Sequence, residues 1–339
     1  MTRSWNSSDS SLRHVSLPGQ ALITCFYLLG VGGNVCALAL LAKARAGANE
    51  KHALMLRCLS VGDLLALLGS FALMYARLYL DPRRVATSVF CALRVLLRTF
   101  GLWSGCVAAV MAVERYLALA RPFLYHKHIT YKVIKRVILA TWMVALALVC
   151  LPLMGFGLYY DGQATDGRPV CVRYRFARSA KDVAYAYLML GFGLSLCLIM
   201  AGCNLAVVKV LCRIGAKKWQ AGAGRTVVRK ESNELAFDHV TAEEVAFAKL
   251  MIVFCIFFVV CWLPQMVTIV MAQADPEGEE RPFYRVADVL LATNFSLDPI
   301  VYVLSRRAHR EGLKRMLRPV CQFCRFRRPD APSSIPDAV

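Results

Sequence analysis

The chain has 339 residues, of which 58% are hydrophobic, and its mean hydropathy is +0.50. Soluble domains contain about 45–50% apolar residues, so this composition excludes an ordinary soluble protein and predicts several membrane-spanning helices. The formal charge of +19 lies in the gaps between apolar runs, which is typical of membrane topology signals and argues against nucleic-acid binding.

The first 19 residues are polar, and Asn6 begins an Asn-Ser-Ser sequence that is an acceptor for N-linked glycosylation if this end is extracellular. No basic stretch precedes a short apolar core, so no cleavable signal peptide is expected. The first span is predicted at residues 20–41 and contains Asn34, whose amide should face other helices rather than lipid. The loop after this span is more basic than the residues before it, which places the N-terminus outside the cell.

The second predicted span, residues 53–73, contains Asp63 near its middle. A lone carboxylate inside a span is costly, so we interpret it as a cation or proton site. The third span ends at Glu114-Arg115-Tyr116, where the apolar run stops. This charged end is either an ordinary interfacial flank or a switch that faces a cytoplasmic partner.

The fourth span is predicted at residues 137–156 and is followed by a loop of residues 157–182, called the lid below. The lid contains Cys171, and Cys91 lies at the outer end of the third span. Both thiols therefore lie in the oxidising compartment, which predicts a disulfide between them. An isolated free thiol is the less favoured alternative.

The fifth span is predicted at residues 183–211 and lacks proline. The sixth span is predicted at residues 250–272 and contains Pro264, two residues after Trp262. A proline inside a span removes a backbone donor and kinks the helix, which neighbouring helices can accommodate. The seventh span is predicted at residues 284–304.

The segment after the seventh span is basic and amphipathic, which suits a helix lying on an anionic membrane surface. Cys321 and Cys324 follow it. They are either a redox or metal pair or, more simply, palmitoylation sites. The predicted organisation is an extracellular N-terminus (1–19), an all-α seven-transmembrane helix bundle (20–305), and a short cytoplasmic amphipathic helix with a tail (306–339).

Several motifs occur together in a characteristic order. They are Gly33-Asn34, Leu59 with Asp63, Glu114-Arg115-Tyr116, Trp142, Cys261-Trp262-Leu263-Pro264, and Asp298-Pro299 with Tyr302. This set resembles the rhodopsin-class G protein-coupled receptors over about residues 20–324. The resemblance implies coupling and switch roles for Glu114, Arg115, Tyr116, Trp262, Pro264, Asp298, Pro299 and Tyr302. It also implies a polar core of Asn34, Asp63 and Asp298 that holds sodium at Asp63 and favours the resting arrangement.

Within that class the chain is similar to the prostanoid receptors, and most similar to the Gs-coupled prostaglandin E type. The similarity lies in residues 111–119 with Phe123-Leu124-Tyr125, in residues 151–157, in the proline-free fifth span, in Asn294 with Leu297-Asp298-Pro299, and in the Cys321 and Cys324 pair. It implies a plasma-membrane receptor that binds an extracellular lipid acid similar to prostaglandin E2, activates Gs and raises cyclic AMP. A receptor for another small molecule or peptide, with other coupling, is the alternative.

Two positions depart from the prostanoid pattern. The ligand-binding arginine of that family is replaced by Val289, and Val170 replaces the tryptophan of a Trp-Cys pair in the lid. The predicted ligand contacts are therefore Arg98, Arg94, Arg285, Val289, Trp262 and Tyr75.

Cys91, Arg94 and Arg98 share one helix face, which the disulfide would turn toward the pocket mouth. Arg98 lies about 10 Å deeper than Cys91 at 1.5 Å per residue, which makes it the favoured anchor for an acid, with Arg285 as runner-up. Either arginine of the third span could instead extend to lipid phosphates or pair with Asp288.

The sequence argues against two other classes of protein. A transporter or channel is disfavoured because the sequence shows no repeated halves with broken helices. An enzyme is disfavoured because no phosphate-binding loop, metalloprotease motif or nucleophile elbow occurs. The expected partners are a heterotrimeric G protein, an extracellular ligand and membrane lipids, with no cofactor.

Overall fold

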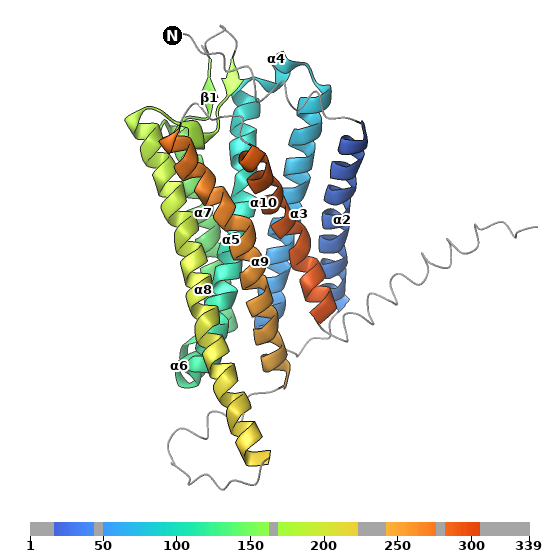
Figure 1. The fold of residues 1–339 in the computed structure, drawn as a ribbon, viewed down its shortest axis with the longest axis vertical. Coiled ribbons are helices and arrows are strands. Elements are labelled where there is room, and N and C mark those ends of the chain that lie inside the picture. Colours follow the sequence, from blue (N-terminus) through green and yellow to red (C-terminus); the bar gives the residue numbers. More distant parts are fainter. Residues whose placement is uncertain (1–16, 44–49, 163–168, 223–241, 276–281, 306–339) are drawn as a thin grey trace, which may run out of the picture.

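The computed structural model describes residues 17–43, 50–162, 169–222, 242–275 and 282–305. Within these ranges seven long helices run side by side (Figure 1). They are α2 (Leu17–Lys43), α3 (Glu50–Tyr79), α5 (Ser88–Ala120), α7 (Tyr131–Cys150), α8 (Ala180–Gly222), α9 (Ala242–Ala274) and α10 (Pro282–Ser305). The predicted seven-helix bundle is confirmed.

Six of these helices are long and apolar enough to cross a membrane, by length and composition. The hydrocarbon core of a bilayer is about 30 Å thick and needs about 20 helical residues. The helix outside this set is α10, which has 24 residues but carries Asp288, Asn294 and Asp298. It packs against α2, α3 and α9. The seventh helix therefore closes the bundle with a polar inner face.

Several helices extend beyond the apolar runs that predicted them. The gap between the predicted fifth span (183–211) and sixth span (250–272) is shorter than these bounds imply, because α8 continues to Gly222 and α9 already begins at Ala242. An apolar run marks only the part of a helix that suits hydrocarbon, whereas Ala, Lys, Arg and Glu readily continue the helix into water. At the start of α7, Thr130 caps the helix by accepting a hydrogen bond from the Val133 amide at 3.3 Å.

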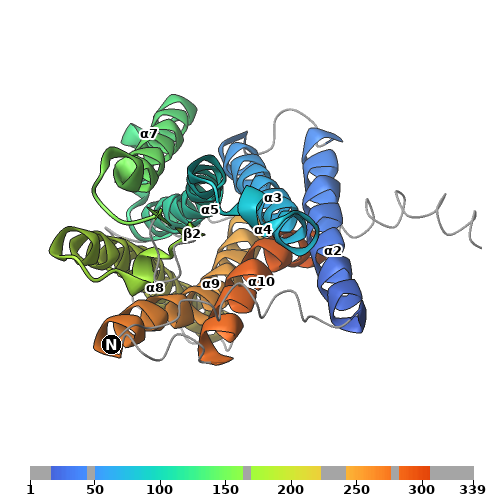
Figure 2. The same cartoon turned by 90° about the horizontal axis from the view of Figure 1, so that it is seen from above.

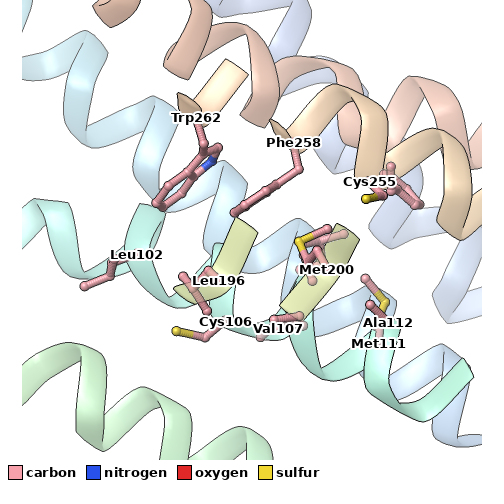
Figure 3. Packing of buried hydrophobic residues seen from close by; sticks show 14 of the residues in the cluster. Leu102, Cys106, Val107, Met111, Ala112, Leu196, Met200, Cys255, Phe258 and Trp262 are labelled. Atoms are coloured by element: carbon pink, nitrogen blue, oxygen red, sulfur yellow. The ribbon is translucent and has the colours of Figure 1, made fainter. Parts of the chain in front are cut away.

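Helix α5 lies at the centre of the bundle, as the view from above shows (Figure 2). It packs against α3, α7, α8 and α9. In its apolar window 67% of the residues are buried, against 22% for α7. Small residues such as Gly101, Gly105 and Ala108 allow this close approach, since small side chains are what helix interfaces in membranes require. Figure 3 shows the resulting core of α5, α8 and α9 side chains.

Before the lid, α7 ends at Cys150 and a short 3-10 helix follows, η1 (Leu151–Met154), with Pro152 in its first turn. Gly155 then adopts a φ of 88° and reverses the chain. Two short antiparallel strands follow, β1 (Tyr160–Asp161) and β2 (Val170–Cys171), and then η2 (Tyr174–Phe176). The all-α prediction omitted this hairpin, whose two-residue strands give too short a sequence pattern to detect.

Two short helices join the long ones at opposite ends of the bundle (Figure 1). Helix α4 (Pro82–Val85) lies at the lid end, where the Asp81 side chain caps it by accepting from the Arg83 amide at 2.9 Å. Helix α6 (Pro122–His128) follows α5 at the other end. Both begin with proline, which suits the first turn of a helix.

The predicted disulfide between Cys91 and Cys171 is confirmed, with their Cα atoms 5.3 Å apart. It joins the start of α5 to β2 of the lid. Because α5 is the central helix, the bond fixes the lid over the middle of the bundle.

Some predicted features lie outside the described residues. These are the glycosylation site at Asn6, the helix and tail of residues 306–339, and the palmitoylation sites at Cys321 and Cys324. Pro299 and Tyr302 lie in α10, but only their helical backbone is described.

We predict that replacing Cys91 and Cys171 together by serine lowers the thermal midpoint of the purified protein by roughly 10 °C. The bond closes a sequence separation of 80 residues, and the chain-entropy relation assigns about 4–5 kcal/mol to a loop of this size. Thermal unfolding in detergent measures the shift. The matched control is the double serine variant of the exposed free cysteines Cys25 and Cys212, and an equal shift in that control would contradict the prediction.

Candidate functional site

A cavity of about 310 Å³ opens between the helices beneath the lid. Each of the seven long helices contributes to its wall, together with the lid residues Arg173, Tyr174 and Arg175. Pockets for small ligands occupy about 300–1,000 Å³ and combine apolar walls with a few polar groups. The cavity therefore has the size and place of a small-molecule site.

The lining of the cavity carries more positive than negative side chains. Four arginines line it, two from α5 (Arg94 and Arg98) and two from the lid (Arg173 and Arg175), whereas Asp288 is the acidic member of the described lining. An enclosed site with an excess of one sign of charge attracts ligands of the opposite sign. The cavity is therefore suited to an anion.

The two arginines of α5 lie where the sequence predicted them, in the cavity wall. The Arg98 guanidinium lies over the ring of Tyr174 in the lid, 5.3 Å from its centroid. Arg94, one turn nearer the lid, interacts electrostatically with Asp288. Both arginines thus face the cavity, and the alternative of pairing with Asp288 applies in part to Arg94.

The lid arginines make the direct contacts with Asp288. Arg173 lies 2.5 Å and Arg175 3.5 Å from its carboxylate oxygens. Arg175 is only 4% exposed, and its guanidinium packs 4.7 Å from the Tyr284 ring centroid and 5.3 Å from that of Phe176. This arginine packs beside two aromatic rings that also contact each other, which restricts its movement.

Burial lowers the pKa of Arg175 to about 10, and repulsion from Arg173 adds to this effect while Asp288 opposes it. A pKa of about 10 still leaves the guanidinium protonated at neutral pH. The Gln273 amide also holds this segment by donating to the Arg175 carbonyl at 2.8 Å and to the Ala177 carbonyl at 3.1 Å. The lid thus presents a permanent positive charge at a fixed place.

The floor of the cavity contains two aromatic rings that rest on glycines of α5. A Cβ atom at Gly105 would lie 3.0 Å from the Trp262 ring, and one at Gly101 would lie 2.8 Å from the Phe295 ring. Trp262 is in turn stacked on Phe258, with ring centroids 4.7 Å apart (Figure 3). Trp262 therefore connects the cavity with the core below it, where the predicted Pro264 lies inside α9.

The α10 residues Asp288, Leu291, Ala292 and Phe295 line the cavity, with the spacing of one helix face. Val289 lies off this face with a side chain 61% exposed.

The other two predicted ligand contacts also lie outside the described lining. Arg285 is exposed. The Tyr75 hydroxyl is 2.6 Å from that of Thr24, at the contact between α2 and α3. That these residues contact a ligand stays a prediction, and neither belongs to the described lining of the cavity.

At the opposite end of the bundle, Glu114 and Arg115 form a closed ion pair. The Arg115 Nε and Nη2 atoms lie 2.7 and 2.9 Å from the two oxygens of the Glu114 carboxylate. Arg115 is 1% exposed. The two residues are therefore paired and buried, and their predicted role as a switch stays a prediction.

Three further side chains seal this pair. Tyr125 of α6 donates from its hydroxyl to Glu114 at 2.6 Å. His52 of α3 lies 3.3 Å from the same carboxylate and also contacts Arg115. Lys51 lies over the Tyr125 ring, 4.2 Å from its centroid. The pair is thus connected to both α3 and α6.

A second buried polar group lies in the middle of the bundle, where the sequence predicted a core of Asn34, Asp63 and Asp298. Ser104 donates to Asp63, and Asn34 donates to the Phe295 carbonyl at 3.0 Å. One oxygen of Asp63 and the amide oxygens of Asn34 and Asn294 have no hydrogen-bond partner among the described residues. Oxygen atoms are the ligands that hard cations prefer, and a sodium ion among these residues stays a prediction.

The sequence predicted some residues of the cavity and the Glu114–Arg115 pair, but not all of the residues that contact them. Arg173 and Arg175 were not identified, although they follow the bridged Cys171 by two and four residues, which places them at the pocket mouth. His52 and Tyr125 come from separate helices. No spacing in the sequence links either one to Glu114.

Comparison with known families identifies the class of protein. The family model of the seven-transmembrane receptors of the rhodopsin family matches residues 33–302. The match covers most of the chain, and the chain therefore belongs to this family. It is a multi-pass membrane receptor and not an enzyme.

Several individual relatives are prostanoid receptors. The dog (Canis lupus familiaris) prostaglandin E2 receptor EP2 subtype is 27% identical over 311 residues, which are 84% of this chain and 81% of that protein. The human prostacyclin receptor is 29% identical over 90% of this chain and 77% of its own length. The human prostaglandin E2 receptor EP3 subtype is 29% identical over 66% of this chain and 57% of its own length. The predicted resemblance to prostanoid receptors is confirmed.

We predict that Tyr125→Phe increases ligand-independent signalling several-fold. The variant removes one hydrogen bond to the charged Glu114, worth about 1.5–3 kcal/mol, and the bond is expected to favour the resting arrangement. Basal second-messenger levels normalised to surface expression measure the effect. Tyr131→Phe, at the exposed start of α7, is the control, and basal signalling equal to wild type in Tyr125→Phe would contradict the prediction.

We also predict that Asp63→Asn removes any effect of sodium on agonist affinity, because it deletes the carboxylate with the unpartnered oxygen. Agonist competition binding at low and high sodium, with choline chloride keeping the ionic strength equal, measures the effect. A sodium response unchanged from wild type would exclude this role for Asp63.

Proposed function

We propose that the chain is a plasma-membrane G protein-coupled receptor for an extracellular lipid acid similar to prostaglandin E2, and that it raises cyclic AMP through Gs. Its N-terminus and lid would lie outside the cell, and α6 would lie inside. The observation that carries the proposal is the small cavity lined by four arginines and one acid. Such a site suits a molecule with an apolar body and one carboxylate.

The names of the relatives support this ligand class, since they include receptors for prostaglandin E2 and for prostacyclin. Arg98 is the proposed anchor for the carboxylate, because it lies in the cavity wall beside Tyr174 of the lid. A guanidinium in a poorly hydrated site can hold a carboxylate through two parallel hydrogen bonds. Asn6 as a glycosylation site and Cys321 and Cys324 as palmitoylation sites belong to the same proposal.

The proposed mechanism is a shift between two arrangements of the bundle. A ligand shifts the equilibrium only by the difference between its affinities for the two arrangements. Trp262 lies both at the cavity floor and on the core, so a ligand that contacts its ring can alter the packing of α9 around Pro264. In the active arrangement Arg115 would leave Glu114 and meet the G protein.

A second candidate is a receptor of the same family for a different anionic small molecule, coupled to another G protein. It is favoured by α10, where Val289 is turned away from the cavity and Asp288 faces it. It is also favoured by the mixture of relatives, which include the EP3 subtype and the prostacyclin receptor.

The proposal predicts that prostaglandin E2 raises cyclic AMP in cells that express the chain, while its uncharged methyl ester acts far more weakly. Arg98→Ala should abolish the response at normal surface expression, because loss of a buried partner of a charge costs about 2–5 kcal/mol. Arg98→Lys should restore it only in part, since lysine lacks the planar fork.

Arg285→Ala is the matched control, because Arg285 lies outside the described lining of the cavity. A loss of response in Arg285→Ala with a normal response in Arg98→Ala would move the anchor to α10. A fall in cyclic AMP, or calcium mobilisation alone, would overturn Gs coupling. Activation by an organic cation would overturn the lipid-acid proposal.

A further inference from the structure

The lid arginines already hold a carboxylate, which belongs to the receptor itself. We propose that Asp288 is an internal competitor for the acid group of the ligand: it occupies Arg173 and Arg175 in the unliganded receptor, and an acidic ligand must displace it. This inference rests on the proposed function for the class of ligand. It adds the lid arginines to Arg98, in the same cavity, as partners of the one ligand carboxylate.

The first support is the geometry of the site around Asp288. Its carboxylate lies 2.5 Å from Arg173 and 3.5 Å from Arg175, and all three residues line the cavity. Arg175 cannot follow a departing partner, because Phe176 and Tyr284 hold its guanidinium and Thr268 accepts from it at 3.4 Å. A fixed guanidinium whose partner leaves must be given another anion, since an unpaired buried charge is costly.

The second support is that the Asp288 and Arg175 side chains differ in their exposure to solvent. The Asp288 side chain is 38% exposed, whereas that of Arg175 is 5% exposed. The acid is therefore the member of the pair that can be exchanged, and the arginine is the member that stays. A carboxylate arriving from the cavity would replace like with like, so that the charge at Arg175 remains balanced.

The third support is a place for the displaced acid. Arg94 on α5 interacts electrostatically with Asp288 from the facing wall of the cavity. On displacement, Asp288 can keep a cationic partner without leaving the site. The exchange then moves one carboxylate between two sets of arginines instead of exposing an unpaired charge.

The exchange has a consequence for selectivity. A binding site that is open only a fraction of the time has its apparent affinity reduced by that fraction. If Asp288 occupies the lid arginines for all but about a tenth of the time, an acid binds about 10-fold more weakly than it would without Asp288. A neutral ester does not compete for the guanidinium groups, so its affinity is independent of this occupancy.

The test uses Asp288→Asn, which keeps the shape of the side chain and removes its charge. In competition binding on membranes, the variant should bind prostaglandin E2 about 10-fold more tightly than wild type, with the affinity of the methyl ester unchanged. Asp182→Asn is the matched control, because Asp182 lies at the end of the lid and pairs with Ser179 at 2.6 Å, outside the cavity. Equal gains for acid and ester, or a loss for the acid, would overturn the inference.

A second measurement separates this inference from the proposed function. Hydrogen exchange of the Val172, Phe176 and Ala177 amides, which are hydrogen-bonded within the lid, needs no ligand. Exchange should be at least threefold faster in Asp288→Asn than in wild type or Asp182→Asn. If prostaglandin E2 binds none of these proteins, the proposed function is wrong, yet faster lid exchange still supports Asp288 as the partner of the lid arginines. Unchanged exchange overturns that role whatever the ligand.

Discussion

The constraint on which this structure depends is that a charge inside an apolar bundle must have a partner. Removing an ion from water costs several kcal/mol even after relaxation, and only close, well-oriented partners offset that cost. The chain meets this requirement at three levels. Arg175 is paired with Asp288 below the lid, Asp63 is bonded to Ser104 in the middle, and Glu114 is paired with Arg115 at the far end. The Arg175 pair joins the lid to α10, the Asp63 bond joins α3 to α5, and the Glu114–Arg115 pair within α5 is bonded to Tyr125 of α6.

The central helix connects these three levels. Helix α5 carries Arg98 at the cavity, Ser104 beside Asp63, and the Glu114–Arg115 pair at its far end. The disulfide at its first turn adds the lid to the same element. A ligand held between the lid and α5 would therefore contact a helix that carries or adjoins these three groups. This continuity gives a physical basis for coupling across the membrane without a separate transmitting element.

Much of the fold could be predicted because its signals are local. Apolar runs locate the spans, and the positions of Cys91 and Cys171 at one end of the bundle were enough to predict their bond. The site was harder, because it depends on which helix face turns inward. Val289 and Asp288 are adjacent in sequence, yet only Asp288 lines the cavity, and no local pattern decides between them. Likewise, Tyr125 meets Glu114 only because α6 folds back under α5, which requires the tertiary arrangement.

The glycines under the cavity floor set a physical limit on what the cavity can hold. The rings of Trp262 and Phe295 lie so close to the α5 backbone that a single methyl group at Gly105 or Gly101 would collide with them. The absence of a side chain at Gly101 and Gly105 therefore determines how deep the cavity is. An alanine at either position would raise the floor and shorten the longest chain that fits between it and the lid. For the proposed ligand, the backbone of α5 would limit the length and the arginines above it would select the charge.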